Sequence, residues 1–167
     1  MPPGTVGEIV HRSPHATLGY YKGEDKTASA FRNGWFHSGD LGVMSEDGYL
    51  SVVDRIKDMI KTGGENVASR EVEEVLFEVP GVAEVAVFGI SHPQWVEAVT
   101  AVVVPKAGAT LSVDEITAHA RERLAGYKRP KYVAFAESLP KNPSGKILKR
   151  ELRERYGHLA TVDQPSS

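Results

Sequence analysis

The pattern of apolar and polar positions changes along the chain, and the change falls at residues 54–61. Upstream of it, short runs rich in β-branched and aromatic residues alternate with glycine-containing turn sequences, which predicts small antiparallel β structure. The expected elements are strands at residues 6–12, from Trp35 and at 49–53, a strand end at 18–23, helical turns at 25–31, and tight turns at Asn33-Gly34 and Glu46-Asp47-Gly48. So few strands cannot close a barrel, so we expect this section to be a remnant of a larger domain.

Downstream of the change, amphipathic helices and nearly continuous apolar runs predict an independently packed domain. A hairpin is expected at residues 60–67, strands covered on both faces at 82–90 and 98–104, a third strand at 132–135 and a last helix at 147–156. Ser69 is expected to N-cap one helix, and Ser112 with Glu115 forms a capping box for another. The predicted apolar stripes consist of Val72, Val75, Leu76 and Val79 on the first helix and of Val113, Ile116, Ala120 and Leu124 on the second.

This order of elements predicts an α+β fold, a small mixed β-sheet packed with helices and preceded by a short antiparallel β remnant of the large domain. We therefore divide the chain into residues 1–56, the end of that large domain, residues 57–158, a mobile C-terminal domain, and a disordered tail at 159–167. The stretch at 54–61 contains neither glycine nor proline, so it is expected to be a short exposed connection with a defined shape.

Composition limits the function classes. The net charge is −2, which does not favour nucleic acid or an anionic membrane as a partner. The chain has no cysteine, which excludes disulfides, thiol nucleophiles and cysteine-ligated zinc, and no apolar run approaches the roughly 20 residues of a membrane span. The six histidines show no spacing typical of a metal site. These observations predict a cytoplasmic protein, in which any anion-binding site must be local.

One loop stands out for its chemistry, Pro140-Lys-Asn-Pro-Ser-Gly-Lys146. Its two prolines limit the freedom of the backbone, and a lysine follows directly after glycine. A Walker A loop would need glycine in place of Pro140 and serine or threonine in place of Ile147, so the loop is not one. Two interpretations remain from the residues: a lysine that delivers one positive charge to an anion, or a solvated lysine before a basic helix.

Other candidates each have an ordinary structural alternative. Asp40 could accept hydrogen bonds from a ribose or could be a turn aspartate, and Arg55 could bind a phosphate or form an ion pair between domains. Trp95 could stack on a base or pack against the sheet. Tyr127 is followed by a basic patch that could bind phosphate or be plain solvated surface, and its members are Lys128, Arg129 and Lys131.

Taken together and in this order, these sequences resemble the C-terminal part of the adenylate-forming superfamily, which includes acyl-CoA synthetases, aryl-CoA ligases, luciferases and nonribosomal peptide adenylation domains. The resemblance covers nearly the whole chain. The motifs that carry it are Gly7-Glu-Ile-Val, Gly19-Tyr-Tyr, Gly34-Trp-Phe-His-Ser-Gly-Asp40-Leu-Gly, Asp54-Arg-Ile-Lys-Asp58, Gly63-Gly-Glu-Asn66 and the loop that ends at Lys146.

The resemblance implies an AMP-forming acyl-CoA ligase that activates a carboxylic acid, expected to be a fatty acid, with ATP and Mg²⁺ and transfers it to CoA. In this family Asp40 would bind the ribose of the nucleotide with help from Arg55, and Lys57 would be the hinge of the C-terminal domain. Lys146 would be the catalytic adenylation lysine. CoA would be held by the hairpin loop and by the aromatic and basic positions, namely Gly63, Gly64, Glu65, Trp95, Tyr127, Arg129 and Lys131.

Two departures from the family pattern qualify these implications. Ala68 and Ser69 stand where the family usually has an aromatic residue and proline. The phosphate loop, the acyl-pocket helix and the magnesium-binding glutamate of the family would precede Gly7, so this fragment alone is expected to be inactive and to lack the magnesium ligands. The alternatives are a stand-alone, non-catalytic module that binds CoA or a carrier, and an adenylation domain that feeds a carrier protein.

Overall fold

The computed structural model describes residues 1–162, and these residues form two compact units, Met1–Lys57 and the described residues from Asp58 onward. The boundary falls after Lys57, whereas the sequence predicts it before this residue. The two units are described separately below, as unit 1 and unit 2.

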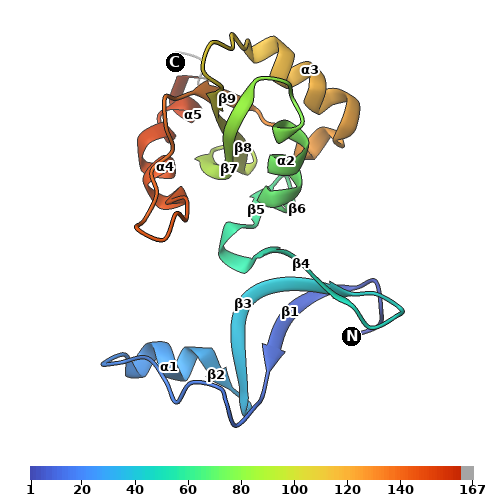
Figure 1. Ribbon diagram of the computed structural model, residues 1–167, viewed down its shortest axis with the longest axis vertical. Coiled ribbons are helices and arrows are strands. Elements are labelled where there is room, and N and C mark those ends of the chain that lie inside the picture. The colour runs from blue at the N-terminus through green and yellow to red at the C-terminus, as the bar shows by residue number, and fades with distance from the viewer. Residues whose placement is uncertain (163–167) are drawn as a thin grey trace. The chain divides into compact units, whose positions relative to one another are not determined.

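Unit 1 is a four-stranded antiparallel sheet with one short helix, α1 (Glu24–Ala30). The long strand β3 (Trp35–Met44) pairs with all the other strands of the unit, which are β1 (Val6–His11), β2 (Phe31–Arg32) and β4 (Leu50–Arg55). Figure 1 shows β3 beside β1. Asn33 and Gly34 connect β2 to β3 with φ angles of 55° and 76°. Two consecutive left-handed residues are typical of the tight hairpin turn that the sequence predicted.

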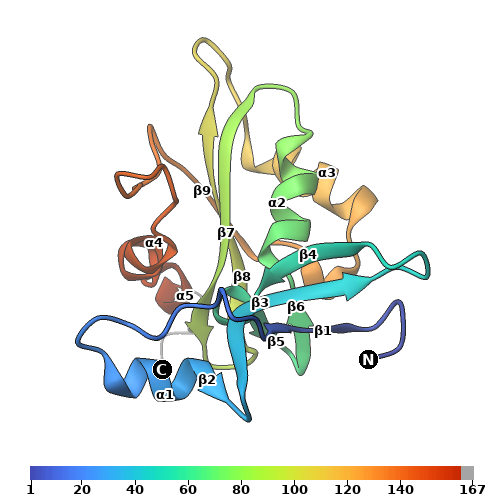
Figure 2. The same ribbon diagram turned by 60° about the horizontal axis from the view of Figure 1, so that its bottom comes forward.

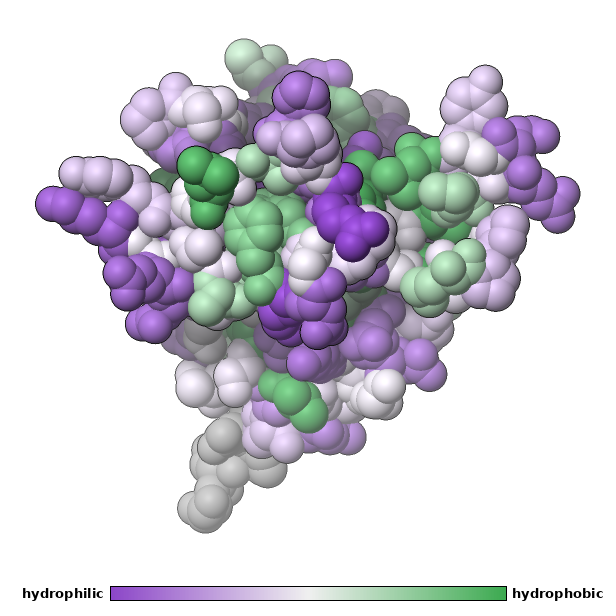
Figure 3. Space-filling model, turned by 90° about the horizontal axis from the view of Figure 1, so that it is seen from below, coloured by the Kyte–Doolittle hydropathy of each residue, from purple (hydrophilic) through white to green (hydrophobic). Residues whose placement is uncertain are grey.

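Unit 1 contains few buried residues. Among its described residues only Gly42 and Asp54 are buried, while large apolar side chains such as Tyr21 and Tyr49 are exposed. The surface view in Figure 3 shows apolar side chains, in green, among polar ones. Residues 18–23, expected to end a strand, form turns instead, because the backbone N–H of Tyr20 donates to the Thr27 hydroxyl rather than to a neighbouring strand.

Unit 2 is built on a five-stranded sheet in the order β6-β5-β8-β7, with β9 paired to β8. The β8–β9 pair is parallel and the other pairs are antiparallel, so the sheet is mixed. Its strands are β5 (Ile60–Thr62), β6 (Glu65–Val67), β7 (Val82–His92), β8 (Val96–Pro105) and β9 (Tyr132–Phe135). The remaining elements are the short 3-10 helices η1 (Ile56–Asp58), which crosses the unit boundary, and η2 (Gly126–Lys128), and the helices α2 (Ser69–Phe77), α3 (Val113–Arg123), α4 (Lys149–Tyr156) and α5 (Leu159–Val162).

Helices cover both faces of this sheet. Figure 2 shows α2 and α3 on one side and α4 and α5 on the other. Alternate residues of β7 face these two layers: Val85 and Val87 belong to the core with α2 and α3, whereas Ala86 and Phe88 belong to the core with α4 and α5. This period of two with apolar residues on both faces is what the sequence predicted for a doubly covered strand. The α+β fold class is therefore confirmed.

Three details of the predicted helices are wrong. Helix α2 is N-capped by Ala68 without a side-chain hydrogen bond, because the Ser69 hydroxyl is buried and accepts a 2.6 Å hydrogen bond from Lys149 Nζ. Val113, assigned to the apolar stripe of α3, is 46% exposed because it lies in the first turn of the helix, where the chain enters from a loop. The last helix begins at Lys149, since the preceding residues belong to the loop of Lys146.

The predicted disordered tail needs a partial correction. Its first residues form α5, and Ala160 is buried in the core that also contains Ala86 and Phe88 of β7. The short apolar segment therefore packs where a polar tail would not. Residues 163–167 lie outside the part of the chain that the structure describes. Across residues 1–162, no helix is both long enough and apolar enough to cross a membrane.

Phe88 offers a test of the core of unit 2. Its side chain is fully buried between β7 and the α4 layer, so Phe88→Ala is expected to lower the free energy of unfolding by about 3–5 kcal/mol through lost burial and the cavity left behind. Urea unfolding followed by circular dichroism measures this change. Phe77→Ala is the matched control, because Phe77 is 58% exposed and its loss should cost less than about 1 kcal/mol. Equal losses for both variants would contradict the described core.

Candidate functional site

Asp40 and Arg55 form a cross-strand ion pair in unit 1. They lie opposite each other in the β3–β4 register, and Arg55 Nε donates to Asp40 Oδ1 at 3.0 Å. Both side chains are partly open to solvent, with 31% and 42% of the side chain exposed respectively. A carboxylate in this position keeps acceptor capacity for hydroxyl groups, and the guanidinium keeps further N–H donors. The pair can therefore bind a polar ligand that carries both hydroxyls and negative charge.

A second polar cluster lies beside Asp40 and was not found from the sequence. Glu8 on β1 accepts a hydrogen bond from His37 Nδ1 at 2.7 Å and another from the backbone N–H of Gly39 at 3.2 Å. Arg32 Nη2 lies 3.8 Å from the same carboxylate. The hydrogen bond from His37 is the main cause that lowers the pKa of Glu8 below its ordinary value. Glu8 therefore stays ionised and links β1 to the backbone just before Asp40.

Lys146 ends a tight loop whose backbone is held by one side chain. Asn142 Oδ1 accepts hydrogen bonds from the backbone N–H of Lys146 at 2.8 Å, the backbone N–H of Ser144 at 3.1 Å and the Ser144 hydroxyl at 2.8 Å. Lys141 and Ile147 pair across the base of the loop. The Lys146 side chain is exposed and forms no ion pair with any other described residue. The loop therefore presents one solvated positive charge on a rigid support.

Lys57 lies in the middle of η1 and is the last residue of unit 1. Its side chain is exposed, as are those of Ile56 and Lys61, whereas Asp54 and Ile60 are buried. The expectation of an exposed connection at residues 54–61 is thus correct only in part. On the unit 2 side, Arg153 Nη2 lies 3.6 Å from Asp58 Oδ1 and ties the connection to α4.

The Gly63-Gly64 turn between β5 and β6 borders a pocket in unit 2. Both glycines have positive φ angles, 58° and 87°, and Glu65 follows them with an exposed side chain. The backbone N–H of Gly63 donates to the carbonyl of Trp95 at 3.0 Å, which fixes the turn against the β7–β8 connection. Positions with a positive φ angle favour glycine, so the conformation of this turn depends on its two glycines.

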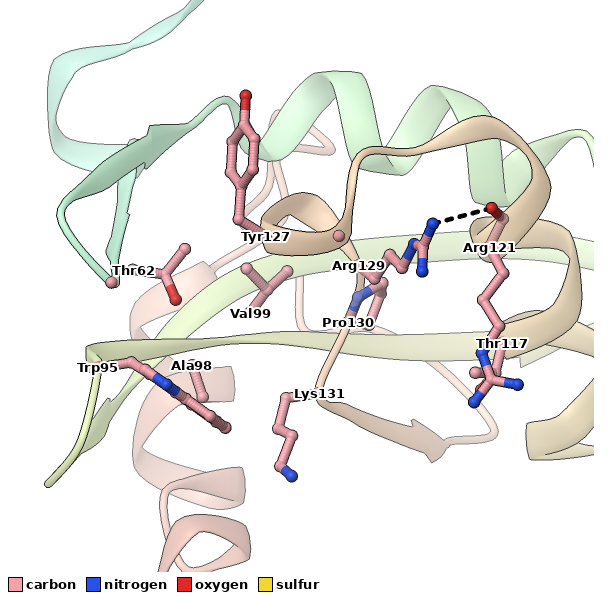
Figure 4. Close-up of a pocket in the computed structure, with 12 residues that line it drawn as sticks. Thr62, Trp95, Ala98, Val99, Thr117, Arg121, Tyr127, Arg129, Pro130 and Lys131 are labelled. Atoms are coloured by element: carbon pink, nitrogen blue, oxygen red, sulfur yellow. Dashed lines mark hydrogen bonds between the residues drawn. The ribbon is translucent and has the colours of Figure 1, made fainter.

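The pocket has a volume of about 500 Å³ and combines aromatic and basic side chains. Lys131 Nζ lies 5.2 Å from the centre of the Trp95 ring, and His92 stacks on the same indole at 4.3 Å. Tyr127 extends from η2 and lies above Trp95 and Lys131 in the view of Figure 4. The pocket is lined by Thr62, Gly63, Trp95, Ala98, Val99, Thr117, Arg121, Gly126, Tyr127, Arg129, Pro130 and Lys131. It can hold an aromatic ring with a nearby negative charge.

Two basic residues of the predicted patch have structural partners. Arg129 Nε donates to the carbonyl of Leu124 at 3.0 Å, and its Nη2 donates to the carbonyl of Arg121 at 3.1 Å, so this guanidinium caps the end of α3 (Figure 4). Lys128 Nζ lies 2.6 Å from Glu71, and this hydrogen bond is the main cause that raises the pKa of Lys128. The patch is therefore less available to a ligand than its sequence suggested.

The structure thus groups the sequence candidates into separate places. Gly63, Trp95, Tyr127, Arg129 and Lys131 share the pocket, whereas Gly64, Glu65 and Lys146 lie outside its lining. Asp40 and Arg55 form their own pair in unit 1. The lining also includes Thr62, Thr117 and Arg121, which no sequence motif marks. Asn142 carried a signal, since Asn-Pro followed by glycine is typical of a turn held by the asparagine side chain. Among residues 1–162, no three His, Cys, Asp or Glu side chains are grouped so that they could hold a metal ion.

Comparisons with known proteins agree on one relationship. Residues 71–146 match the AMP-binding enzyme C-terminal domain. The chain is 51% identical over 157 residues to a feruloyl-CoA synthase from Amycolatopsis, an alignment that covers 94% of this chain and 32% of that protein. It is 47% identical to the long-chain-fatty-acid–CoA ligase FadD13 of Mycobacterium tuberculosis over 93% of this chain and 30% of the relative.

A solved structure supports the same relationship. ATP-bound MatB from Rhodopseudomonas palustris matches with a TM-score of 0.90 and 40% identity, over 96% of this chain and 32% of the MatB chain. The chain therefore spans about a third of the length of the relatives that it matches.

Proposed function

Because this chain carries the C-terminal domain of the AMP-binding acyl- and aryl-CoA ligases, we propose that it acts as the part of such a ligase that completes the active site. The proposed reaction has two steps. A carboxylate attacks the α-phosphorus of ATP, which forms acyl-AMP and releases pyrophosphate. The thiolate of CoA then attacks the acyl carbonyl, which forms the thioester and releases AMP.

The observation that carries the proposal is the exposed Lys146 on its braced loop. An ammonium group held by a rigid backbone can stabilise negative charge that builds up between the carboxylate and the α-phosphate, without reorganisation at the moment of reaction. Asp40 and Arg55 are proposed to bind the ribose and its neighbouring phosphate from unit 1. No magnesium ligand is assigned to residues 1–162, since no three His, Cys, Asp or Glu side chains are grouped there.

For the second step, we assign the nucleotide end of CoA to the pocket of unit 2. Trp95 offers a stacking surface and Lys131 a positive charge beside it. The Gly63-Gly64 turn borders this pocket and is proposed to line the path of the pantetheine arm. These features favour CoA over a carrier-protein arm, which has no nucleotide to stack. Arg129 acts chiefly as the cap of α3, and its contact with CoA is the weaker part of this assignment.

The acid is the least defined part of the proposal. The two curated relatives carry names that differ in the acid, ferulate and a long-chain fatty acid, while their identities to this chain are close, 51% and 47%. This portion of the enzyme is therefore shared whatever acid is activated. We propose a fatty acid as the acid to be tested first and ferulate as the second.

The test is acyl-CoA and AMP formation by the full-length enzyme with ATP, CoA and a panel of carboxylic acids. Stoichiometric acyl-CoA, AMP and pyrophosphate are expected for at least one acid. AMP that appears with a carrier protein but not with CoA would favour the adenylation domain that feeds a carrier. Binding of CoA without any ATP-dependent product would favour the non-catalytic module, and either result would overturn the ligase.

Trp95→Ala tests the CoA assignment. Loss of the stacking surface is expected to raise KM for CoA about tenfold, equivalent to ~1.4 kcal/mol, while ATP–pyrophosphate exchange stays unchanged. Trp95→Phe is the matched control, because it keeps an aromatic face and should recover most of the affinity. An unchanged KM for CoA in the alanine variant would show that the nucleotide of CoA binds elsewhere.

A further inference from the structure

We propose that Glu8, held by His37, is a positioning residue that fixes the backbone of Gly39 and Asp40 and so keeps the Asp40 carboxylate in place for its ligand. The inference rests on the proposed role of Asp40 at the nucleotide. It assigns a task to a side chain of β1 that need not touch any substrate.

The backbone around Asp40 is irregular on both sides. The β1–β3 register changes between Glu8, which pairs with Leu41, and Val10, which pairs with His37. Three residues of β3, at positions 38–40, thus lie opposite the single residue of β1 between Glu8 and Val10. This irregularity is a β-bulge. Gly39 has a φ of 75°, and the β3–β4 register also changes just after Leu41. Bulges of this kind re-aim a side chain, at the cost of the regular strand hydrogen bonds.

Side chains replace the hydrogen bonds that the bulge removes. The Gly39 N–H donates to Glu8 Oε1 at 3.2 Å, and the Asp40 N–H donates to the Ser38 hydroxyl at 3.0 Å. The Ser38 hydroxyl in turn donates to the carbonyl of Ile9 at 2.8 Å. The N–H groups of Gly39 and Asp40 are therefore satisfied by side chains, as partly buried backbone groups require. Of the two side chains that accept these backbone hydrogen bonds, Glu8 comes from another strand, whereas Ser38 belongs to β3 itself.

The pairing with His37 explains why the acceptor is a carboxylate. One oxygen of Glu8 accepts from the backbone and the other from the imidazole, so the rotamer of Glu8 is held at both ends. The side chains of Glu8 and His37 are only 22% and 20% exposed. The nearest other charge is that of Arg32 on β2. Asp25 and Lys26 on α1 line the same surface pocket as Glu8 and His37. A charged acceptor forms the stronger hydrogen bond to a backbone N–H, which suits a bulge that must keep one geometry.

The experiment is steady-state kinetics of the full-length enzyme with Glu8→Ala. KM for ATP in pyrophosphate exchange is expected to rise about tenfold, ~1.4 kcal/mol, with kcat within about twofold and KM for CoA unchanged. Glu8→Gln keeps an acceptor for the Gly39 N–H and should recover most of the affinity for ATP. Glu46→Ala, which removes an exposed glutamate of the β3–β4 turn, is the matched control and should match the wild type. A fall in kcat alone would mean a loss of folded enzyme and would overturn the inference.

A double-mutant cycle separates this inference from the role of Asp40. If Glu8 acts through Asp40, Glu8→Ala should raise KM for ATP in the wild type but not in an Asp40→Asn background. Additive effects would overturn the positioning role and leave the proposed function intact. An Asp40→Asn variant with normal KM for ATP would instead overturn the role of Asp40. Should Glu8→Ala not fold, His37→Ala releases only one end of the carboxylate and should raise KM about threefold, ~0.7 kcal/mol; an unchanged KM would contradict the inference.

Discussion

Lys146→Ala in the full-length enzyme is expected to reduce acyl-adenylate formation about 100- to 1,000-fold, measured as ATP–pyrophosphate exchange. The side chain is exposed, and the loop below it is held by Asn142 rather than by the lysine itself, so the substitution should leave the fold intact. Thioester formation from supplied acyl-AMP and CoA should stay within about threefold of the wild type, because the charge that Lys146 stabilises builds up only in the first step.

The control for this prediction is Lys106→Ala, which removes an exposed lysine of unit 2 from the loop after β8. Both half-reactions of that variant should match the wild type. Equal losses of adenylation and thioester formation in Lys146→Ala would contradict the role of this lysine. A selective loss of thioester formation would reverse its assignment to the first step.

Unit 2 could be predicted from sequence because its signals are local or periodic. The apolar residues along β7 and the capping box at Ser112 can each be recognised from residues that are close in the sequence, and the structure has both. Ser69 was mispredicted because a distant residue decided its role. Lys149, 80 positions away, takes the Ser69 hydroxyl and also pairs with Glu73 at 2.8 Å. A largely buried ammonium group needs such partners, and the sequence near Ser69 does not show that Lys149 will be there.

The residues of the candidate site differ in the same way, because some depend on neighbours in the sequence and others on distant residues. The loop of Lys146 could be identified because its prolines, asparagine and glycine lie within seven residues, and the structure builds the turn from these residues. The partners of Arg129 were not predicted, since a basic residue near an aromatic one does not show that its guanidinium caps a helix. Glu8 was missed for a topological reason: it meets His37, 29 positions away, only when β1 pairs with β3.

Lys57→Pro is expected to lower thioester formation about 100-fold while acyl-AMP formation largely survives. We propose that the C-terminal domain swings about Lys57 between the two half-reactions, so backbone angles in η1 must change. Proline fixes φ near −65° and restricts Ile56 before it, at a cost of about 3 kcal/mol in a conformation that needs other angles. That cost corresponds to roughly 100-fold in rate. The measurements are pyrophosphate exchange and the transfer of supplied acyl-AMP to CoA.

Lys57→Ala is the matched variant for the hinge, because it removes the exposed side chain and leaves the backbone free. It should keep both half-reactions within about threefold of the wild type, since the proposed role belongs to the backbone. Together the two substitutions distinguish the effect of losing the Lys57 ammonium group from the effect of blocking the proposed rotation of the C-terminal domain. Loss of adenylation with intact thioester formation in Lys57→Pro would show that the hinge assignment is wrong. Loss of thioester formation in Lys57→Ala as well would move the role from the backbone to the ammonium group.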